Sequence, residues 1–199
     1  MYKTQKDILD RIEQSNLKAF STYDFLDLGN YKSISKGLEL LEDEGHLKRA
    51  RRGIYYKPSF NKTLGIECPP SINDIAEAIS RQYNWDIIPS GNHALNLIGI
   101  STQVPSKIIY ISNGPYREYD VGANKIIFKH STTREISSIS KKILISIQAL
   151  KEIGKENVTD YQLKMINRFL DSKDKETINS GIRTTSWIYD ALRRSICIQ

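Results

Sequence analysis

The fold of the N-terminal part of the chain is decided by residues 28–57, LGNYKSISKGLELLEDEGHLKRARRGIYYK. The middle of this stretch has apolar residues at the spacing of one helix face: Ile34, Leu38 and Leu41. The spacing predicts a helix that opens near Ser33 and ends at Gly45, because glycine readily adopts the left-handed conformation that stops a helix.

The period changes after this helix. Residues 47–50 and 54–57 are short extended segments, and Arg51, Arg52 and Gly53 connect them. This pattern predicts a β-hairpin with basic residues at its tip.

Two further helices are expected before Gly29. Ile8, Leu9 and Ile12 lie at helical spacing within residues 4–14, and a short helix is expected to begin at Ser21 or Thr22. That short helix should run through Leu28 until Gly29 and Asn30 break it. Three helices, a glycine-containing turn between the second and third, and a hairpin are typical of a winged helix-turn-helix. We therefore predict that residues 1–60 form a winged helix-turn-helix DNA-binding domain.

In such a domain the start of the third helix enters the major groove of DNA. The candidate DNA-binding residues there all have hydrogen-bonding side chains: Asn30, Tyr31, Lys32, Ser33, Ser35 and Lys36. Arginines of the hairpin are candidates for phosphate or minor-groove contacts: Arg49, Arg51 and Arg52. Taken singly, polar residues on a short helix or arginines in a turn are usually only solvated. Their occurrence together in this order favours DNA binding, although winged helices can also bind proteins or RNA.

Residues 61–70 are expected to be a linker, because the surrounding stretch has little periodicity and contains Pro58, Gly65, Pro69 and Pro70. A helix should follow from Ser71, which forms a capping box with Asp74. The expected strands are residues 86–89, 107–112, 119–121 and 125–129, and the expected helices include 90–98, 141–153, 159–169 and 186–195. The predicted fold class is thus α+β, with the winged helix-turn-helix followed at 71–199 by a mixed α/β C-terminal domain that has a small sheet and C-terminal helices.

The charge of the chain is compatible with a polyanionic partner. There are 29 Lys and Arg residues against 23 Asp and Glu residues, a net charge of +6, and the isoelectric point is about 9.2. Residues 46–62 contain six basic residues and no acidic one: Lys48, Arg49, Arg51, Arg52, Lys57 and Lys62. The basic charge is therefore concentrated around the predicted hairpin.

We find no pattern of catalytic residues, metal ligands or cofactor-binding residues in the chain. The three histidines, His46, His93 and His130, lack metal-ligand spacing, and no phosphate-binding loop or nucleophile elbow occurs. The run from Ser90 to His93 has the composition of an anion-binding helix start, but helix capping and packing explain it better. Packing also explains the cluster of aromatic residues Tyr110, Tyr116 and Tyr119 better than a binding surface does.

The longest apolar runs are far too short to span a bilayer, and the N-terminus lacks a secretory signal, so we expect a cytoplasmic protein without a membrane partner.

Two blocks of the sequence resemble a known family. They are residues 33–58 and residues 89–105, the latter PSGNHALNLIGISTQVP, together with the later Gln148-Ala-Leu150. These blocks resemble the AbiEi-like antitoxin family of type IV toxin-antitoxin systems, over most of the chain.

The resemblance implies a sequence-specific autorepressor that binds inverted repeats in double-stranded promoter DNA. It also implies that the C-terminal domain acts as an antitoxin against a nucleotidyltransferase-like toxin, without a stable complex between the two proteins. The alternatives are a solitary regulator without antitoxin activity, an interaction module that binds the toxin itself, and a nucleic-acid-processing enzyme. Metal-dependent cleavage that requires Asp86 or Glu118 would indicate the enzyme.

Overall fold

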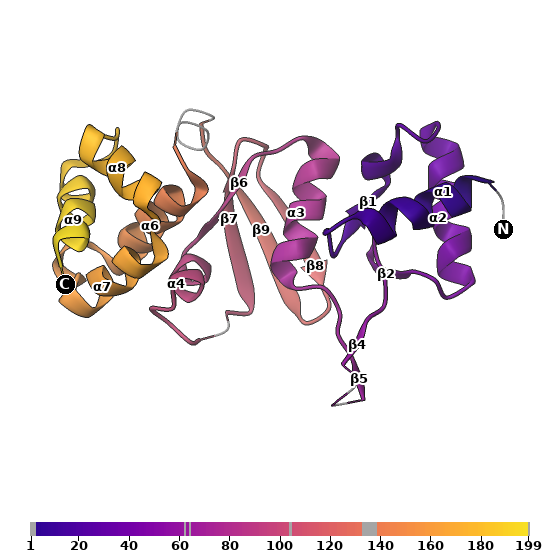
Figure 1. The fold of residues 1–199 in the computed structure, drawn as a ribbon, viewed down its shortest axis with the longest axis horizontal. Helices are drawn as coiled ribbons and strands as arrows, with labels where there is room; N and C mark the ends of the chain where they lie inside the picture. The colour runs from indigo at the N-terminus through magenta and orange to yellow at the C-terminus, as the bar shows by residue number, and fades with distance from the viewer. Residues whose placement is uncertain (1–2, 62, 64, 104, 133–138, 199) are drawn as a thin grey trace. The chain divides into compact units, whose positions relative to one another are not determined.

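The chain has an α+β fold that divides into two compact units, Met1–Trp85 and Asp86–Gln199 (Figure 1). The structure is a computed structural model, and it describes residues 3–61, 63, 65–103, 105–132 and 139–198. Each unit has a hydrophobic core of its own.

The first unit combines three α-helices with short strands. Its elements are α1 (Lys3–Gln14), β1 (Phe20–Ser21), the 3-10 helix η1 (Thr22–Phe25), α2 (Tyr31–Asp43), β2 (Lys48–Arg51), β3 (Ile54–Tyr56), β4 (Phe60–Asn61), β5 (Ile66–Glu67) and α3 (Ile72–Tyr83). Strands β1, β3 and β2 form an antiparallel sheet in that order, and β4 pairs with β5 as a separate ribbon that extends away from the helices of this unit (Figure 1).

The core of the first unit lies between α1, η1, α2 and the three-stranded sheet. Its buried side chains are Ile8, Ile12, Phe20, Phe25, Ile34, Leu38, Leu41, Leu47 and Tyr55. A Cβ atom at Gly37 would lie 3.1 Å from Cδ1 of Ile8, so α1 and α2 approach each other closely at this glycine. This packing fixes which face of α2 remains exposed.

Helix α3 belongs to the first unit, although the sequence suggests a linker at 61–70 and a new domain from residue 71. The segment 61–70 includes β5 and the second residue of β4, and the amide of Cys68 donates to the carbonyl of Ser59 at 2.7 Å. An ion pair of Arg81 on α3 with Asp24 of η1, described below, connects α3 to the same unit. The unit extends to the end of α3 because Arg81 pairs with Asp24, which is far from it in the sequence. No local sequence pattern reveals such a contact.

The second unit is a mixed sheet followed by helices. Its elements are β6 (Ile87–Ser90), α4 (Asn92–Ile98), β7 (Lys107–Ser112), β8 (Arg117–Val121), β9 (Asn124–His130), α6 (Lys141–Ile153), the 3-10 helix η2 (Lys155–Asn157), α7 (Asp160–Phe169), α8 (Ser172–Ser180) and α9 (Ser186–Cys197). The strand order is β6-β7-β9-β8, in which β7 and β9 are parallel and the outer pairs are antiparallel. Helices α4 and α6 pack near the β6 edge, and α6–α9 continue as a helical cluster (Figure 1).

The expected helices and strands of both units are present with small shifts, the short strands β1, β4 and β5 were not expected, and three helices differ from the expectation. The second helix is a 3-10 helix of four residues rather than an α-helix that reaches Leu28. Helix α2 begins at Tyr31 rather than near Ser33, because Asn30 caps it. Helix α8 is not among the expected helices, because Ile178 is its only buried apolar residue and no apolar period marks it.

Candidate nucleic-acid interface

The candidate interface begins at the N-terminus of α2, where Asn30 is the capping residue. The Oδ1 atom of Asn30 accepts a hydrogen bond from the amide of Ser33 at 2.9 Å, which satisfies one of the amides that a helix start leaves without a partner. The side chains of Tyr31, Lys32 and Ser33 are exposed in the first turn. Asn30 therefore fixes where the helix starts, and its neighbours are accessible to a ligand.

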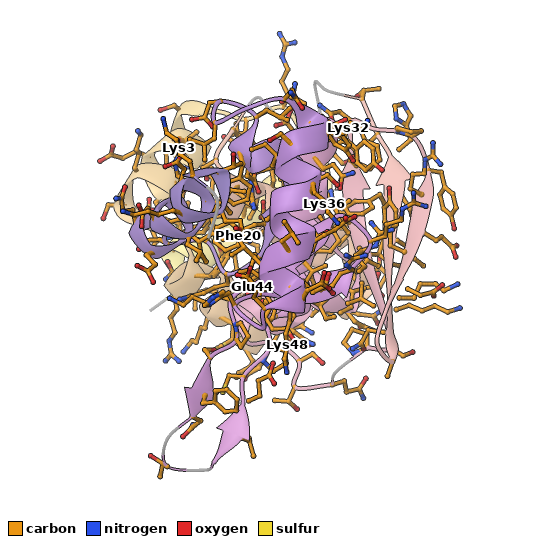
Figure 2. All side chains as sticks on the ribbon, turned by 90° about the vertical axis from the view of Figure 1, so that its right-hand side faces the viewer. Lys3, Phe20, Lys32, Lys36, Glu44 and Lys48 are labelled. Atoms are coloured by element: carbon orange, nitrogen blue, oxygen red, sulfur yellow. The ribbon has the colours of Figure 1, made fainter. Side chains whose placement is uncertain are left out.

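The exposed side of α2 lies opposite the buried residues Ile34, Leu38 and Leu41. Lys32 and Lys36 are both exposed, and Figure 2 shows them one turn apart along the same side of α2. Ser35 is half-buried. The structure thus brings most of the predicted helix residues to one accessible surface at the first half of α2.

The charge of α2 changes sign along the helix. The basic residues lie in its first half, whereas acidic residues follow in its second half and at its C-cap: Glu39, Glu42, Asp43 and Glu44. Nζ of Lys36 lies 3.7 Å from a carboxylate oxygen of Glu39, at the border between the two halves. Only the N-terminal half of α2, where the helix dipole is also positive, favours an anionic ligand.

The predicted hairpin is present as β2 and β3, with Arg52 and Gly53 in its turn. Gly53 has a φ of +79°, which glycine adopts without strain. A β-bulge lies between Arg49 and Arg51, so that Arg49 pairs with Tyr55 and Arg51 with Ile54. A bulge changes the direction of the side chains that follow it. Here it precedes Arg51, which is half-buried, and Arg52, which is exposed.

The basic cluster of residues 46–62 is partly neutralised in space, contrary to the impression that the sequence gives. Lys48 lies 2.5 Å from Glu67, and Lys57 lies 2.9 Å from Glu13. The hydrogen bond from Lys48 to Glu67 raises the pKa of Lys48. Lys62 lies outside the described residues. These acidic partners come from β5 and α1, so a count along the sequence cannot detect them.

Arg49 is also engaged within the unit. Its Nε atom donates to Glu42 of α2 at 2.8 Å, and its guanidinium lies 5.2 Å from the centre of the Tyr55 ring. Burial raises the pKa of Tyr55, and the charge of Arg49 opposes this effect. Arg49 thus holds the hairpin against α2, and the exposed arginine at the turn is Arg52.

Asp24 and Arg81 connect the turn before α2 to α3, a feature that the sequence did not suggest. Nε of Arg81 donates to Asp24 at 3.0 Å, and a second guanidinium nitrogen donates to the carbonyl of Ala19 at 2.8 Å. The same carboxylate accepts a hydrogen bond from the amide of Ser21, the residue before η1, at 2.8 Å. Asp24 is only 14% exposed. This arrangement fixes η1, and with it the approach of the chain to α2.

The candidate functional residues of the second unit lie apart from one another or pack against neighbouring side chains. His93 is half-buried against Tyr110, with 3.2 Å between Nε2 and the hydroxyl, and burial lowers its pKa. Tyr110 is buried, and Tyr119 packs against Phe128. These positions agree with packing roles for Tyr110, Tyr119 and His93.

The structure does not bring together the two carboxylates of the enzyme alternative. Asp86 precedes β6 and bonds to Asn113, whereas Glu118 is on β8 and pairs with Lys125 at 2.9 Å. Strands β6 and β8 are the two opposite edges of the sheet. Within the described ranges, no group of three or more His, Cys, Asp or Glu side chains is arranged to hold a metal ion.

Comparison with known proteins gives one family. The family model described as "Family of unknown function (DUF6088)" matches residues 7–178, which is most of the chain. No curated protein matches the sequence. Among the helices that the structure describes, none is long and apolar enough to cross a bilayer.

Proposed function

We propose that this chain, which belongs to the DUF6088 family, is a transcriptional regulator that binds specific sequences of double-stranded DNA through a winged helix-turn-helix in its first unit. The observation that carries the proposal is the N-terminal half of α2, which exposes Tyr31, Lys32 and Lys36 on a helix whose opposite face is held in the core. A regulator of this kind works in the cytoplasm, as the sequence leads us to expect.

The order of the elements supports the winged helix-turn-helix. Helix α1, strand β1, helix η1 and helix α2 precede the β2–β3 hairpin, and β1 adds a third strand beside β3. In this motif η1 and α2 are the two helices of the helix-turn-helix, and the second of them enters the major groove. The hairpin with Arg52 in its turn is then the wing.

The dimensions and charge of α2 also support this role. The major groove is about 12 Å wide and admits one α-helix. Lys32 and Lys36 would meet phosphates or guanine edges, whereas Glu42 and Asp43 at the other end would be repelled by phosphate. A helix with this charge pattern is best presented to DNA by its N-terminus.

A binding measurement tests the proposal directly. The full chain is titrated into a fluorescent duplex taken from the DNA immediately upstream of its own gene, and into a scrambled duplex of equal composition, at several salt concentrations. We expect the upstream duplex to bind at least about tenfold more tightly, with an affinity that falls steeply with salt. Equal and salt-insensitive binding of the two duplexes would refute the proposal.

The wing gives a narrower prediction. Replacement of Arg52 by alanine should remove about one phosphate contact, so the slope of log affinity against log salt should fall by about 0.9 for all duplexes alike. Lys57→Ala is the matched control, because Lys57 is already paired with Glu13 and its loss should leave the slope unchanged. An unchanged slope in Arg52→Ala would show that the wing does not contact DNA.

The resemblance to AbiEi-like antitoxins supports a second part of the proposal, in which the second unit counteracts a nucleotidyltransferase-like toxin without a stable complex. The test is co-expression with a nucleotidyltransferase encoded beside this gene. Growth arrest by the toxin and rescue by this chain would support the antitoxin role. If this chain does not neutralise the toxin, the antitoxin role is refuted and the alternative of a solitary regulator is supported.

A further inference from the structure

Two tyrosines form an exposed aromatic pair at the start of α2. Tyr23 of η1 is 48% exposed and Tyr31 of α2 is 51% exposed. Their ring centres are 5.7 Å apart, and the rings meet edge to face at 62°. The pair therefore extends the surface of Lys32 and Lys36 onto η1, at a residue that the sequence did not single out.

Both rings are attached to fixed elements. In η1 the neighbours Thr22 and Phe25 are buried, so Tyr23 lies on the outer side of that turn. The hydrogen bond that Asp24 accepts from the amide of Ser21 and the ion pair of Asp24 with Arg81 hold η1 in place. Tyr31 is the first residue of α2, directly after its cap. The positions of the two rings thus follow from the fixed backbone of η1 and of the start of α2.

The chemistry of the pair suits one feature of the major groove. Thymine presents its 5-methyl group there, and apolar side chains distinguish thymine by contact with this methyl group. Tyrosine hydroxyls are common donors to phosphate oxygens. Tyr31 directly precedes the exposed Lys32 in the first turn of α2, so an apolar ring and a cation are both available there to a thymine and to the phosphate backbone.

We propose that Tyr31 reads a thymine methyl group and that Tyr23 is a positioning residue whose ring holds Tyr31 in the orientation that this contact needs. The inference rests on the proposed DNA-binding function. It adds to that function a base preference and a second residue that sets it.

The test compares two forms of the upstream duplex, one with thymidine and one synthesised with deoxyuridine, which lacks only the methyl group. The wild-type chain should bind the deoxyuridine duplex more weakly, by about fourfold for each methyl group contacted. Tyr31→Ala and Tyr23→Ala should bind the thymidine duplex more weakly than the wild type and should no longer distinguish the two duplexes. Tyr23→Phe keeps the ring and should keep the discrimination. Tyr116→Ala alters a 57% exposed tyrosine of the second unit and should behave as the wild type.

The outcomes separate the two proposals. If the wild type binds neither duplex, the DNA-binding function fails and the inference fails with it. If it binds both duplexes equally well, DNA binding stands and the thymine contact is refuted. If Tyr23→Ala still discriminates, Tyr23 does not position Tyr31. Thermal melting of each variant detects a loss of folding. If Tyr23→Ala is unfolded, Tyr23→Leu replaces it, because leucine is apolar but has no ring, and the same loss of discrimination is expected.

Discussion

Reversal of the charges on Lys32 and Lys36 is expected to abolish specific DNA binding. In the double variant Lys32→Glu/Lys36→Glu, two cations at the centre of the candidate interface become anions on the same side of α2. We expect a loss of affinity on the order of 100-fold or more at low salt, together with a salt slope lower by about 2. Anisotropy titrations with the upstream duplex measure both quantities.

A matched reversal elsewhere distinguishes local contact from net charge. Lys151→Glu/Lys155→Glu changes the net charge by the same amount on exposed residues of the second unit. It should reduce affinity only slightly, through the weaker long-range field. Equal losses in the two double variants would show that α2 does not contact DNA. Because a carboxylate introduced in place of Lys36 would lie near Glu39, circular dichroism should first confirm that α2 remains helical.

The second large effect is expected on stability, from Arg81→Ala. Removal of the guanidinium leaves the carboxylate of Asp24, 14% exposed, without its cation and the carbonyl of Ala19 without its donor. The loss of a partner from this partly buried ion pair costs about 2 kcal/mol, between the values for exposed and for fully buried pairs. The free energy of unfolding of the first unit should fall by about this amount.

Tryptophan fluorescence can assign this effect to the first unit. The chain has two tryptophans, Trp85 at the end of the first unit and Trp187 on α9. In a Trp187→Phe background, urea unfolding followed by fluorescence reports on Trp85 alone. Arg168→Ala, an exposed arginine on α7, should change the stability by less than about 0.5 kcal/mol. If the free energy of unfolding of Asp24→Ala/Arg81→Ala falls by the sum of the losses in the two single variants, the two residues are not coupled.

The sequence predicts those parts of the fold that local patterns determine. The apolar period of Ile34, Leu38 and Leu41 and the hairpin around Gly53 are such patterns, and both features are present. The helix starts expected at the capping box of Ser71 and at residue 159 are also present. In each case the signal lies within one turn or one hairpin.

The features that were missed depend on contacts between distant residues or on weak patterns. Strand β1 has only two residues, and its partner β3 lies more than 30 residues away. Helix α8 lacks an apolar period, although its capping box of Asp171 and Asp174 is a signal that could have indicated it.

The sequence predicts the exposed face of α2 in the candidate site but not the ion pairs that its residues form. Lys32 and Lys36 could be placed on an exposed face because the buried face of α2 has a clear period. Arg49 is a predicted DNA contact, and in the structure its guanidinium pairs with Glu42 while the residue stays exposed. Its pairing could not be read locally, because the register between the hairpin and α2 is set by tertiary packing. Tyr23 offered only the weak signal of an aromatic residue in a short polar helix.

The ion pairs of the hairpin region bear on how such a regulator would distribute itself over a genome. Lys48, Arg49 and Lys57 are each paired with a carboxylate of their own unit, so in the proposed complex they would displace few counterions from DNA. Affinity for arbitrary sequence comes mainly from that displacement, and each engaged cation adds to it. If the hairpin region is neutralised in this way, a smaller fraction of the protein would be bound to the many unrelated DNA sites. A smaller number of copies per cell would then suffice to keep one operator filled.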